Sequence, residues 1–261
     1  MRKNRILVAF ALVVISLLFS CKKVIKIDLN SASPQIVIEG NMYDQPGPAI
    51  VKIYKSVNFN QSNSYPAVTG ATVVINDNSG YSEQLTEKQP GTYATSTMMG
   101  NPGQTYTLVV SAYGQSYTAS STMPEPVTIG KIYFQNSLFG HNIYPGVIFN
   151  DPPNINNYYR LILFVNNVKQ PDINVTDDRL SEGKIITYLI RPRDTDIKLK
   201  TGDNIGFWLE SVDKNVYEYF RTAGREGGQS ASPANPTSNI SNGALGYFNA
   251  CSIRTSSSVV P

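Results

Sequence analysis

The sequence predicts a mostly β protein, in which an N-terminal antiparallel sandwich of immunoglobulin or transthyretin type is followed by a second β-rich module with one short helix. Apolar and polar residues alternate with a period of two in many short segments. The 261 residues include 19 Gly, 16 Pro and 16 Tyr, a composition typical of short strands joined by many turns. In the mature chain, a helical period is clear in one segment only, near residue 216.

The first twenty residues predict a signal peptide. Residues 1–5 are basic, and residues 6–19 are apolar except for Ser16. These fourteen residues would span about 21 Å as a helix. A membrane-spanning helix needs roughly 20 apolar residues, so we expect an export signal and not a transmembrane segment.

The export signal ends in Leu-Phe-Ser-Cys at residues 18–21, which resembles the bacterial lipobox. In a lipobox the Cys is acylated and becomes the mature N-terminus. Cys21 is therefore the predicted lipid anchor, and residues 21–34 are the predicted lipidated N-terminal segment. The alternative is an ordinary signal peptide that contains a Cys. Lys22, and not an Asp, follows Cys21, which favours the outer membrane and leaves open the choice between a periplasmic and a surface-exposed leaflet.

The charge and the cysteines limit the function classes. Three of the 22 Lys and Arg lie in residues 1–20, which leaves 19 basic and 19 acidic residues in the mature chain. A neutral chain argues against a nucleic-acid partner, because phosphate binding needs a basic surface. If Cys21 is acylated, only Cys251 is left, so we expect no intramolecular disulfide.

The first module is predicted to span residues 35–123. Alternating or short apolar runs predict its strands at 36–38, 50–54, 71–75, 105–112 and 117–119, after a first short strand at 25–29. Residues 76–80, Asn-Asp-Asn-Ser-Gly, predict a tight turn. The prolines of Met-Pro-Glu-Pro at 123–126 interrupt strand pairing, so the module boundary is expected there.

The second module is predicted to span residues 127–261. Its strands are expected at 129–135, 147–149, 158–165, 184–191, 205–212 and 246–253. Both faces of 158–165 are largely apolar, which predicts a central strand covered on both sides. The helix is expected after Asp213, its N-cap, with Val216, Phe220 and Ala223 on one face. Residues 225–246 then form a long loop rich in Gly, Ser, Asn and Pro.

Catalytic and metal-binding patterns are weak. His141 is the single histidine, and we expect it in a surface loop. The acidic pairs Asp177/Asp178 and Asp194/Asp196 could serve glycoside hydrolysis or bind calcium, but neighbouring acids in polar loops are usually only solvated. We therefore predict no catalytic residue, no metal and no cofactor. An envelope hydrolase that uses carboxylates stays open as an alternative.

Binding of a ligand or partner is better supported by the sequence than catalysis or metal binding. Aromatic side chains provide contact area at low entropic cost, and a loop rich in Gly, Asn and Ser provides adaptable hydrogen bonds. We predict that residues 233–248 form or border a contact surface for a ligand or partner, with the candidate residues Trp208, Tyr217, Asn239, Asn242 and Tyr247. The alternative is that these aromatic residues belong to the core and that the loop only closes one end of the sandwich.

Four features in order resemble a known family. They are the lipobox and strand at 21–29, Ile36-Val-Ile-Glu-Gly40, the sandwich pattern Gly70-Ala-Thr-Val73, Gly91-x-Tyr93 and Gly103-x-x-Tyr106-x-Leu108 closing at Pro124, and the terminal Asn239-Ile-Ser-Asn-Gly243. Together they resemble the uncharacterised Bacteroidetes lipoproteins grouped as domain of unknown function 4249. This resemblance implies an accessory role beside a TonB-dependent outer-membrane receptor, and it implies no catalytic or binding residues.

These observations give one expected function and two alternatives. We expect a lipid-anchored outer-membrane protein that binds a ligand or partner without catalysis, acting with a TonB-dependent transporter. The alternatives are the envelope hydrolase and a structural or adhesive surface protein. A structural or adhesive protein would show an exposed aromatic or apolar strip and no pocket, which distinguishes it from a binding protein.

Overall fold

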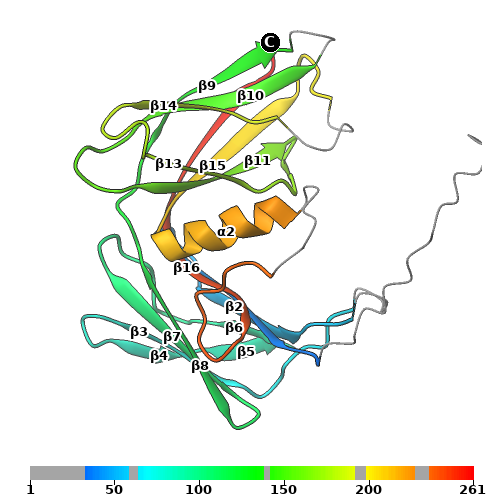
Figure 1. The fold of residues 1–261 in the computed structure, drawn as a ribbon, viewed down its shortest axis with the longest axis vertical. Helices are drawn as coiled ribbons and strands as arrows, with labels where there is room; N and C mark the ends of the chain where they lie inside the picture. The colour runs from blue at the N-terminus through cyan, green and yellow to red at the C-terminus, as the bar shows by residue number, and fades with distance from the viewer. Residues whose placement is uncertain (1–32, 59–63, 138–141, 192–197, 227–234) are drawn as a thin grey trace, which may run out of the picture. The chain divides into compact units, whose positions relative to one another are not determined.

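The computed structural model describes residues 33–58, 64–137, 142–191, 198–226 and 235–261 (Figure 1). Residues 34–261 cluster into one compact unit. Several predictions fall outside the described residues: Cys21 with its signal sequence, the strand at 25–29, His141, Asp194 and Asp196. None of the helices among the described residues is both long and apolar enough to cross a membrane.

The described chain is mostly β, as predicted, and its strands form three sheets. The largest has the order β12-β11-β15-β16-β1-β2-β6-β5, with β13 also paired to β11. Its strands are β1 (Ile36–Tyr43), β2 (Ile50–Lys55), β5 (Thr86–Gln89), β6 (Thr92–Ala94), β11 (Tyr158–Val165), β12 (Val168–Lys169), β13 (Asn174–Asp177), β15 (Asn204–Val212) and β16 (Leu245–Val259).

Two smaller sheets accompany the large one. The four-stranded sheet has the order β4-β3-β7-β8, and its strands are β3 (Thr72–Asp77), β4 (Ser82–Gln84), β7 (Thr105–Ala112) and β8 (Gln115–Thr122). The three-stranded sheet has the order β14-β10-β9, and its strands are β9 (Ile129–Asn136), β10 (Ile143–Asn150) and β14 (Ile185–Leu189). The helix α2 (Lys214–Glu226) follows β15 directly.

The C-terminal strand β16 connects the two halves of the large sheet. Residues Leu245 to Cys251 pair in parallel with β1, and residues Ser252 to Val259 pair antiparallel with β15. Residues 123–128, where the module boundary was predicted, connect β8 to β9 without strand structure. The last strand nevertheless returns to the first, so residues from the C-terminal end contribute to both halves.

Two hydrophobic cores lie on either side of the predicted boundary. The first core packs β1, β2 and β6 against the four-stranded sheet and includes Ile240, Ala244 and Phe248 from the C-terminal region. The second core packs Tyr159, Leu161 and Leu163 of β11, with residues of β15, against the three-stranded sheet. The sandwich predicted from residues 35–123 is therefore completed by residues 240–250.

The helix α2 packs on the face of the large sheet that is opposite to the two hydrophobic cores. The Asp213 side chain accepts a hydrogen bond of 2.9 Å from the backbone N–H of Val216, which confirms the predicted N-cap. Val216 and Phe220 are buried against Cys251 and Ile253 of β16. The helical spacing of the apolar residues thus places α2 on the sheet, as the sequence predicted.

Candidate functional site

A polar groove lies where three separate parts of the chain meet. It is bounded by β7 and β8, by the first turns of α2 and by the segment 237–241, and its volume is about 490 Å³. Ligand pockets usually measure about 300–1,000 Å³. Segment 237–241 belongs to the loop that the sequence indicated as a contact surface, so the groove is the candidate functional site.

The side chain of Asn239 holds segment 237–241 in place through a pair of hydrogen bonds to the backbone of Phe248. The Asn239 side chain donates a hydrogen bond to the Phe248 carbonyl and accepts one from the Phe248 N–H, both at 2.9 Å. Next to it, Ile240 forms an isolated β-bridge with Ala119 of β8. The predicted residue Asn239 therefore lines the groove but uses its amide group to position the wall.

The edge of β8 is occupied by the same segment. The Ser241 N–H donates to the Thr118 carbonyl, and the Thr118 N–H donates to Ser241 Oγ, each at 2.8 Å. The Asn242 side chain donates to the Ser116 carbonyl, and its backbone adopts a φ of 55°. Asn242 and Gly243 form a turn, and both have a positive φ. These bonds fit both a binding surface and a segment that closes the sandwich.

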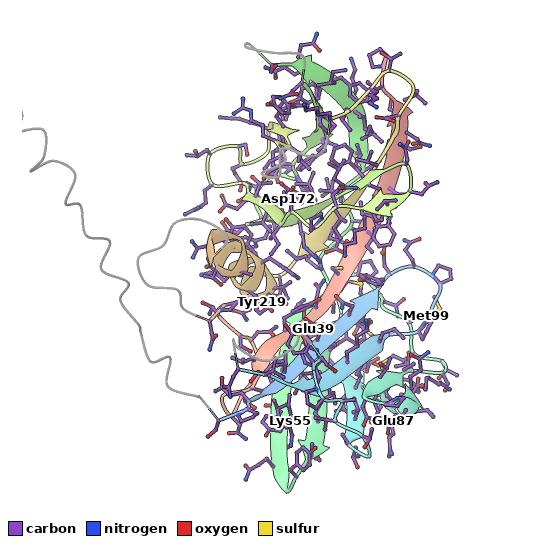
Figure 2. All side chains as sticks on the ribbon, turned by 90° about the vertical axis from the view of Figure 1, so that its right-hand side faces the viewer. Glu39, Lys55, Glu87, Met99, Asp172 and Tyr219 are labelled. Atoms are coloured by element: carbon purple, nitrogen blue, oxygen red, sulfur yellow. The ribbon has the colours of Figure 1, made fainter. Side chains whose placement is uncertain are left out.

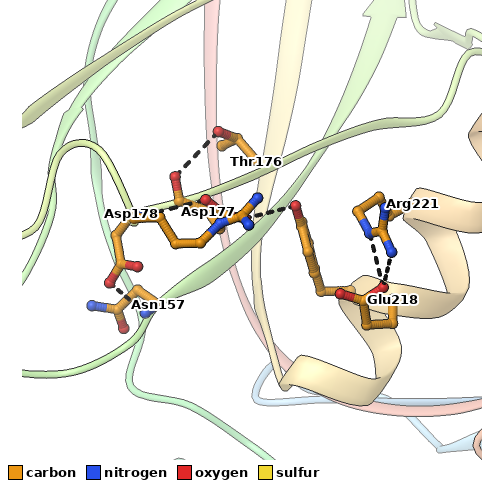
Figure 3. Close-up of polar contacts among 8 residues, drawn as sticks. Asn157, Thr176, Asp177, Asp178, Glu218 and Arg221 are labelled. Carbon is orange, nitrogen blue, oxygen red and sulfur yellow. Dashed lines mark hydrogen bonds and ion pairs between the residues drawn. The ribbon is translucent and has the colours of Figure 1, made fainter.

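Five lining side chains keep a polar atom without a hydrogen-bond partner among the described residues: they are Thr107, Ser120, Thr237, Asn215 and Glu218. Thr107 and Ser120 are cross-strand partners on β7 and β8. Asn215 and Glu218 are three residues apart on α2 and so share a helix face. Glu218 Oε2 accepts from Arg221 Nε at 2.8 Å, which compensates its charge (Figure 3).

The other predicted residues lie in different places. Tyr217 is buried, and its hydroxyl donates to Asp177 Oδ2 at 2.8 Å. Trp208 lies on β15 beside Phe164, with ring centroids 5.0 Å apart, and does not line the groove. The five candidate residues therefore do not form one site.

Tyr247 belongs to an aromatic cluster beside the helix. Its ring lies 4.8 Å from those of Tyr219 and Phe220, and its hydroxyl accepts a hydrogen bond from Asn41. Figure 2 shows Tyr219 of α2 and Glu39 of β1 on the same side of the large sheet. Tyr247 thus fixes the helix against the sheet, which agrees with the core alternative for this residue.

The acidic pair Asp177/Asp178 separates in the structure (Figure 3). Burial raises the pKa of Asp177, but hydrogen bonds from Arg179 and Tyr217 outweigh it and leave that pKa below its ordinary value. Burial, together with the hydrogen bond to Asp177, raises the pKa of Tyr217 to about 12. Burial and the nearby carboxylates of Asp151 and Glu182 instead raise the pKa of Asp178.

Asp178 belongs to a group of three carboxylates that the sequence did not indicate. Oxygens of Asp151, Asp178 and Glu182 lie within 4.8 Å of one another. Carboxylate oxygens are ligands that Ca²⁺ prefers, so these residues could hold such an ion. The backbone N–H of Gly183 donates to Asp151 at 2.9 Å, and that of Asn157 donates to Asp178 at 2.6 Å. Hydrogen bonds within the chain therefore already use part of their capacity.

A second polar cluster lies on the inner side of α2. Arg160 Nη1 is 3.1 Å from Glu210 Oε2, and its guanidinium lies 3.7 Å from the centre of the Phe220 ring. Glu210 is fully buried, and burial raises its pKa although Arg160 opposes this. Burial also raises the pKa of the Cys251 thiol, so this Cys lacks the thiolate character of a nucleophile.

Comparison with protein-family models gives a match over most of the chain. The model of a family described as "Domain of unknown function (DUF4249)" matches residues 22–257. No curated protein matches the chain.

Proposed function

Because the chain belongs to the domain of unknown function 4249 family, with which it aligns from residue 22 to residue 257, we propose that it is a lipid-anchored, non-catalytic binding component of the cell envelope. It acts at the outer membrane together with a TonB-dependent transporter. The family match begins directly after Cys21, the residue that the lipobox makes the mature N-terminus. The lipobox and the neutral mature chain support the anchoring and the absence of a nucleic-acid partner.

The observation that carries the binding role is the polar groove. Its walls come from β7 and β8, from α2 and from the segment 237–241, so the fold brings together parts of the chain more than 100 residues apart. Polar side chains without a partner in the chain lose little by staying in water and gain by binding a ligand. A structural or adhesive protein has no use for such a groove, which makes that alternative less well supported.

The hydrolase alternative has one observation in its favour, the carboxylates of Asp151, Asp178 and Glu182. Asp151 and Asp178 are 4% and 1% exposed, so a polymeric substrate has little access to them. A general acid must lie within hydrogen-bond reach of the bond that it protonates. We therefore favour binding over hydrolysis as the function of this protein.

Membrane fractionation tests the anchoring. We expect the wild-type chain to stay in the membrane fraction after a high-salt wash and to label with a palmitate analogue, and Cys21→Ala to lose both properties. The control is Cys251→Ala, which removes the other Cys of the chain and should label normally. A Cys21→Ala protein that stays membrane-bound after the wash contradicts the proposed lipid anchor.

Affinity purification from native membranes tests the partner. We expect a TonB-dependent transporter among the proteins that co-purify with the wild-type chain, as identified by mass spectrometry. The Cys21→Ala variant, which lacks the anchor, should recover much less of it. Purification of the anchored chain without any outer-membrane transporter contradicts the accessory role.

A further inference from the structure

We propose that the groove binds a neutral polyhydroxylated ligand, a carbohydrate without charged groups. This assignment rests on the binding role proposed above and adds the chemical class of the ligand. Six of the eleven lining residues carry a hydroxyl group and two carry a carboxamide. A hydroxyl group rotates to donate or to accept, and a carboxamide does both at once, so such a surface matches the mixed donors and acceptors of a sugar.

The charges of the groove exclude ionic ligands. Its described lining residues include no Lys or Arg, whereas a phosphate, sulfate or carboxylate ligand is normally bound by cationic side chains. Its single carboxylate, Glu218, is paired with Arg221, so the groove offers little net charge to a cation. Glu218 Oε2 receives both bonds from Arg221, and Oε1 is left to accept from a ligand hydroxyl.

Polar groups interrupt the apolar surface of the groove, which makes an apolar ligand a poor fit. Among the described lining residues, Ala119 and Ile240 are wholly apolar and are buried, at 4% and 8% exposure, and the rest of the apolar surface comes from carbon atoms of polar side chains. An apolar ligand would remove water from the surrounding hydroxyl and amide groups and leave them without partners, which costs free energy for each group. A ligand with many hydroxyl groups replaces that water.

A peptide strand is the main competing ligand, and the chain itself blocks the position that it would need. Added strands bind through the free backbone groups of a sheet edge. At the groove, the backbone of Thr118 already bonds to Ser241, and Ala119 is already bridged to Ile240. Recognition in the groove must therefore use side chains.

The side chains that remain for the ligand are Thr107, Ser120, Asn215, Thr237 and the free oxygen of Glu218. No hydrogen bond joins the first four side chains to another described residue, in contrast to Asn239, Ser238 and Ser241, whose polar atoms are used within the chain. Thr107 and Ser120 are opposite each other on β7 and β8, and Asn215 and Glu218 come from the facing helix. A ligand in the groove can thus be held from two sides.

The test measures binding of the full mature chain to a panel of neutral oligosaccharides: maltoheptaose, cellohexaose, xylohexaose and mannohexaose. The panel also contains an oligogalacturonate, which is anionic, and a Gly-Ser-Thr decapeptide. We expect calorimetry to give a millimolar or tighter Kd for at least one neutral oligosaccharide and weaker binding of the other two probes. The double variant that carries both Thr107→Ala and Ser120→Ala should raise the Kd about tenfold, because each substitution removes one hydrogen-bonding hydroxyl.

A matched pair on the same two strands is the control. Ser111 and Ser116 are also opposite each other on β7 and β8, are exposed, and do not line the groove. Ser111→Ala with Ser116→Ala should leave the Kd within twofold of the wild-type value. Equal weakening by both pairs, equal binding of the decapeptide, or no binding of any neutral oligosaccharide overturns the ligand assignment.

The same experiment separates this assignment from the proposed function. A chain that co-purifies with a transporter but binds no neutral oligosaccharide overturns the ligand class and leaves the accessory role intact. A chain that binds the oligosaccharide through Thr107 and Ser120 but never recovers a transporter confirms the ligand class and contradicts the accessory role.

Discussion

The polar groups on the two sides of helix α2 differ in whether they have a partner within the chain. On the inner side, Arg160 and Glu210 are paired beneath Phe220 and have little contact with water. On the outer side, Asn215 lines a groove together with Thr107 and Ser120, whose hydroxyl groups have no hydrogen-bond partner among the described residues. Paired buried groups fix the helix to the sheet, whereas unpaired groups at a surface are available to a ligand. Whether a polar residue of this protein stabilises the fold or can bind a ligand therefore depends on its hydrogen-bond and ion-pair partners.

The largest effect is expected on the inner side. Arg160→Ala leaves the carboxylate of Glu210 buried without its partner, and breaking a buried ion pair in this way costs about 3–5 kcal/mol. Urea unfolding measures the loss. The matched control is Arg179→Ala, which removes an exposed partner of Asp177 and should cost at most about 1 kcal/mol. If the two variants lose equal stability, the inner cluster does not fix the helix.

Asn239→Ala should give the next largest effect. It removes the two hydrogen bonds to the Phe248 backbone and leaves those groups without a partner, at a cost of about 1–3 kcal/mol. Thermal unfolding of the variant measures this cost. Asn235→Ala, at an exposed position two residues before segment 237–241, is the control and should change stability by less than about 0.5 kcal/mol.

The outcome for Asn239 also decides between the two interpretations of its segment. If Asn239→Ala unfolds earlier but its folded fraction binds ligand normally, the segment only closes the sandwich. Lost binding in the folded fraction indicates instead that the wall of the groove has moved.

A smaller effect is expected in the pH dependence of the unfolding free energy, to which the neighbouring residues Asp177 and Asp178 contribute with opposite signs. The pKa of Asp178 is raised in the folded chain, so its contribution to stability is complete below its ordinary pKa of 3.8 and is lost as the pH rises through the raised value. The pKa of Asp177 is lowered, so its contribution is present above 3.8 and is lost as the pH falls through the lowered value. Unfolding free energies measured between pH 3 and pH 7 should show this difference.

The corresponding variants provide the check. Asp178→Asn should gain stability relative to the wild-type chain as the pH rises above 3.8. Asp177→Asn should lose stability relative to the wild-type chain as the pH rises from the lowered pKa of Asp177 to 3.8. If both variants change in the same direction, the two carboxylates lie in similar environments, contrary to the structure.

Local features of the fold could be predicted from the sequence, because they depend on neighbours in the chain. Alternation at 105–112 predicted β7, and Asp213 with Val216 and Phe220 predicted the start and the buried face of α2. The turn at 76–80 is confirmed by the Asp77 side chain, which accepts hydrogen bonds from the Ser79 and Tyr81 N–H groups.

Long-range features could not be predicted. The parallel pairing of β1 with β16 joins Val37 to Leu245, and no local pattern specifies such a partner. The strand β16 also extends to Val259 through a Ser-rich stretch, because pairing with β15 outweighs the weak alternation there. The same limit applies to the sites: Asp151 and Asp178 are 27 residues apart in sequence, and the groove combines residues from 107 to 241.

One measurement tests the central claim most directly, namely that the outer side of α2 recognises a ligand and the inner side fixes the fold. The measurement compares two proteins, the double variant that carries both Thr107→Ala and Ser120→Ala, and the single variant Arg160→Ala. For each protein, urea unfolding and oligosaccharide binding are measured, the binding at a temperature where both variants are folded. The groove pair should keep its stability within about 0.5 kcal/mol and bind about tenfold more weakly. Arg160→Ala should lose about 3–5 kcal/mol and keep its affinity. Loss of stability and binding together in both variants contradicts the separation of the two sides.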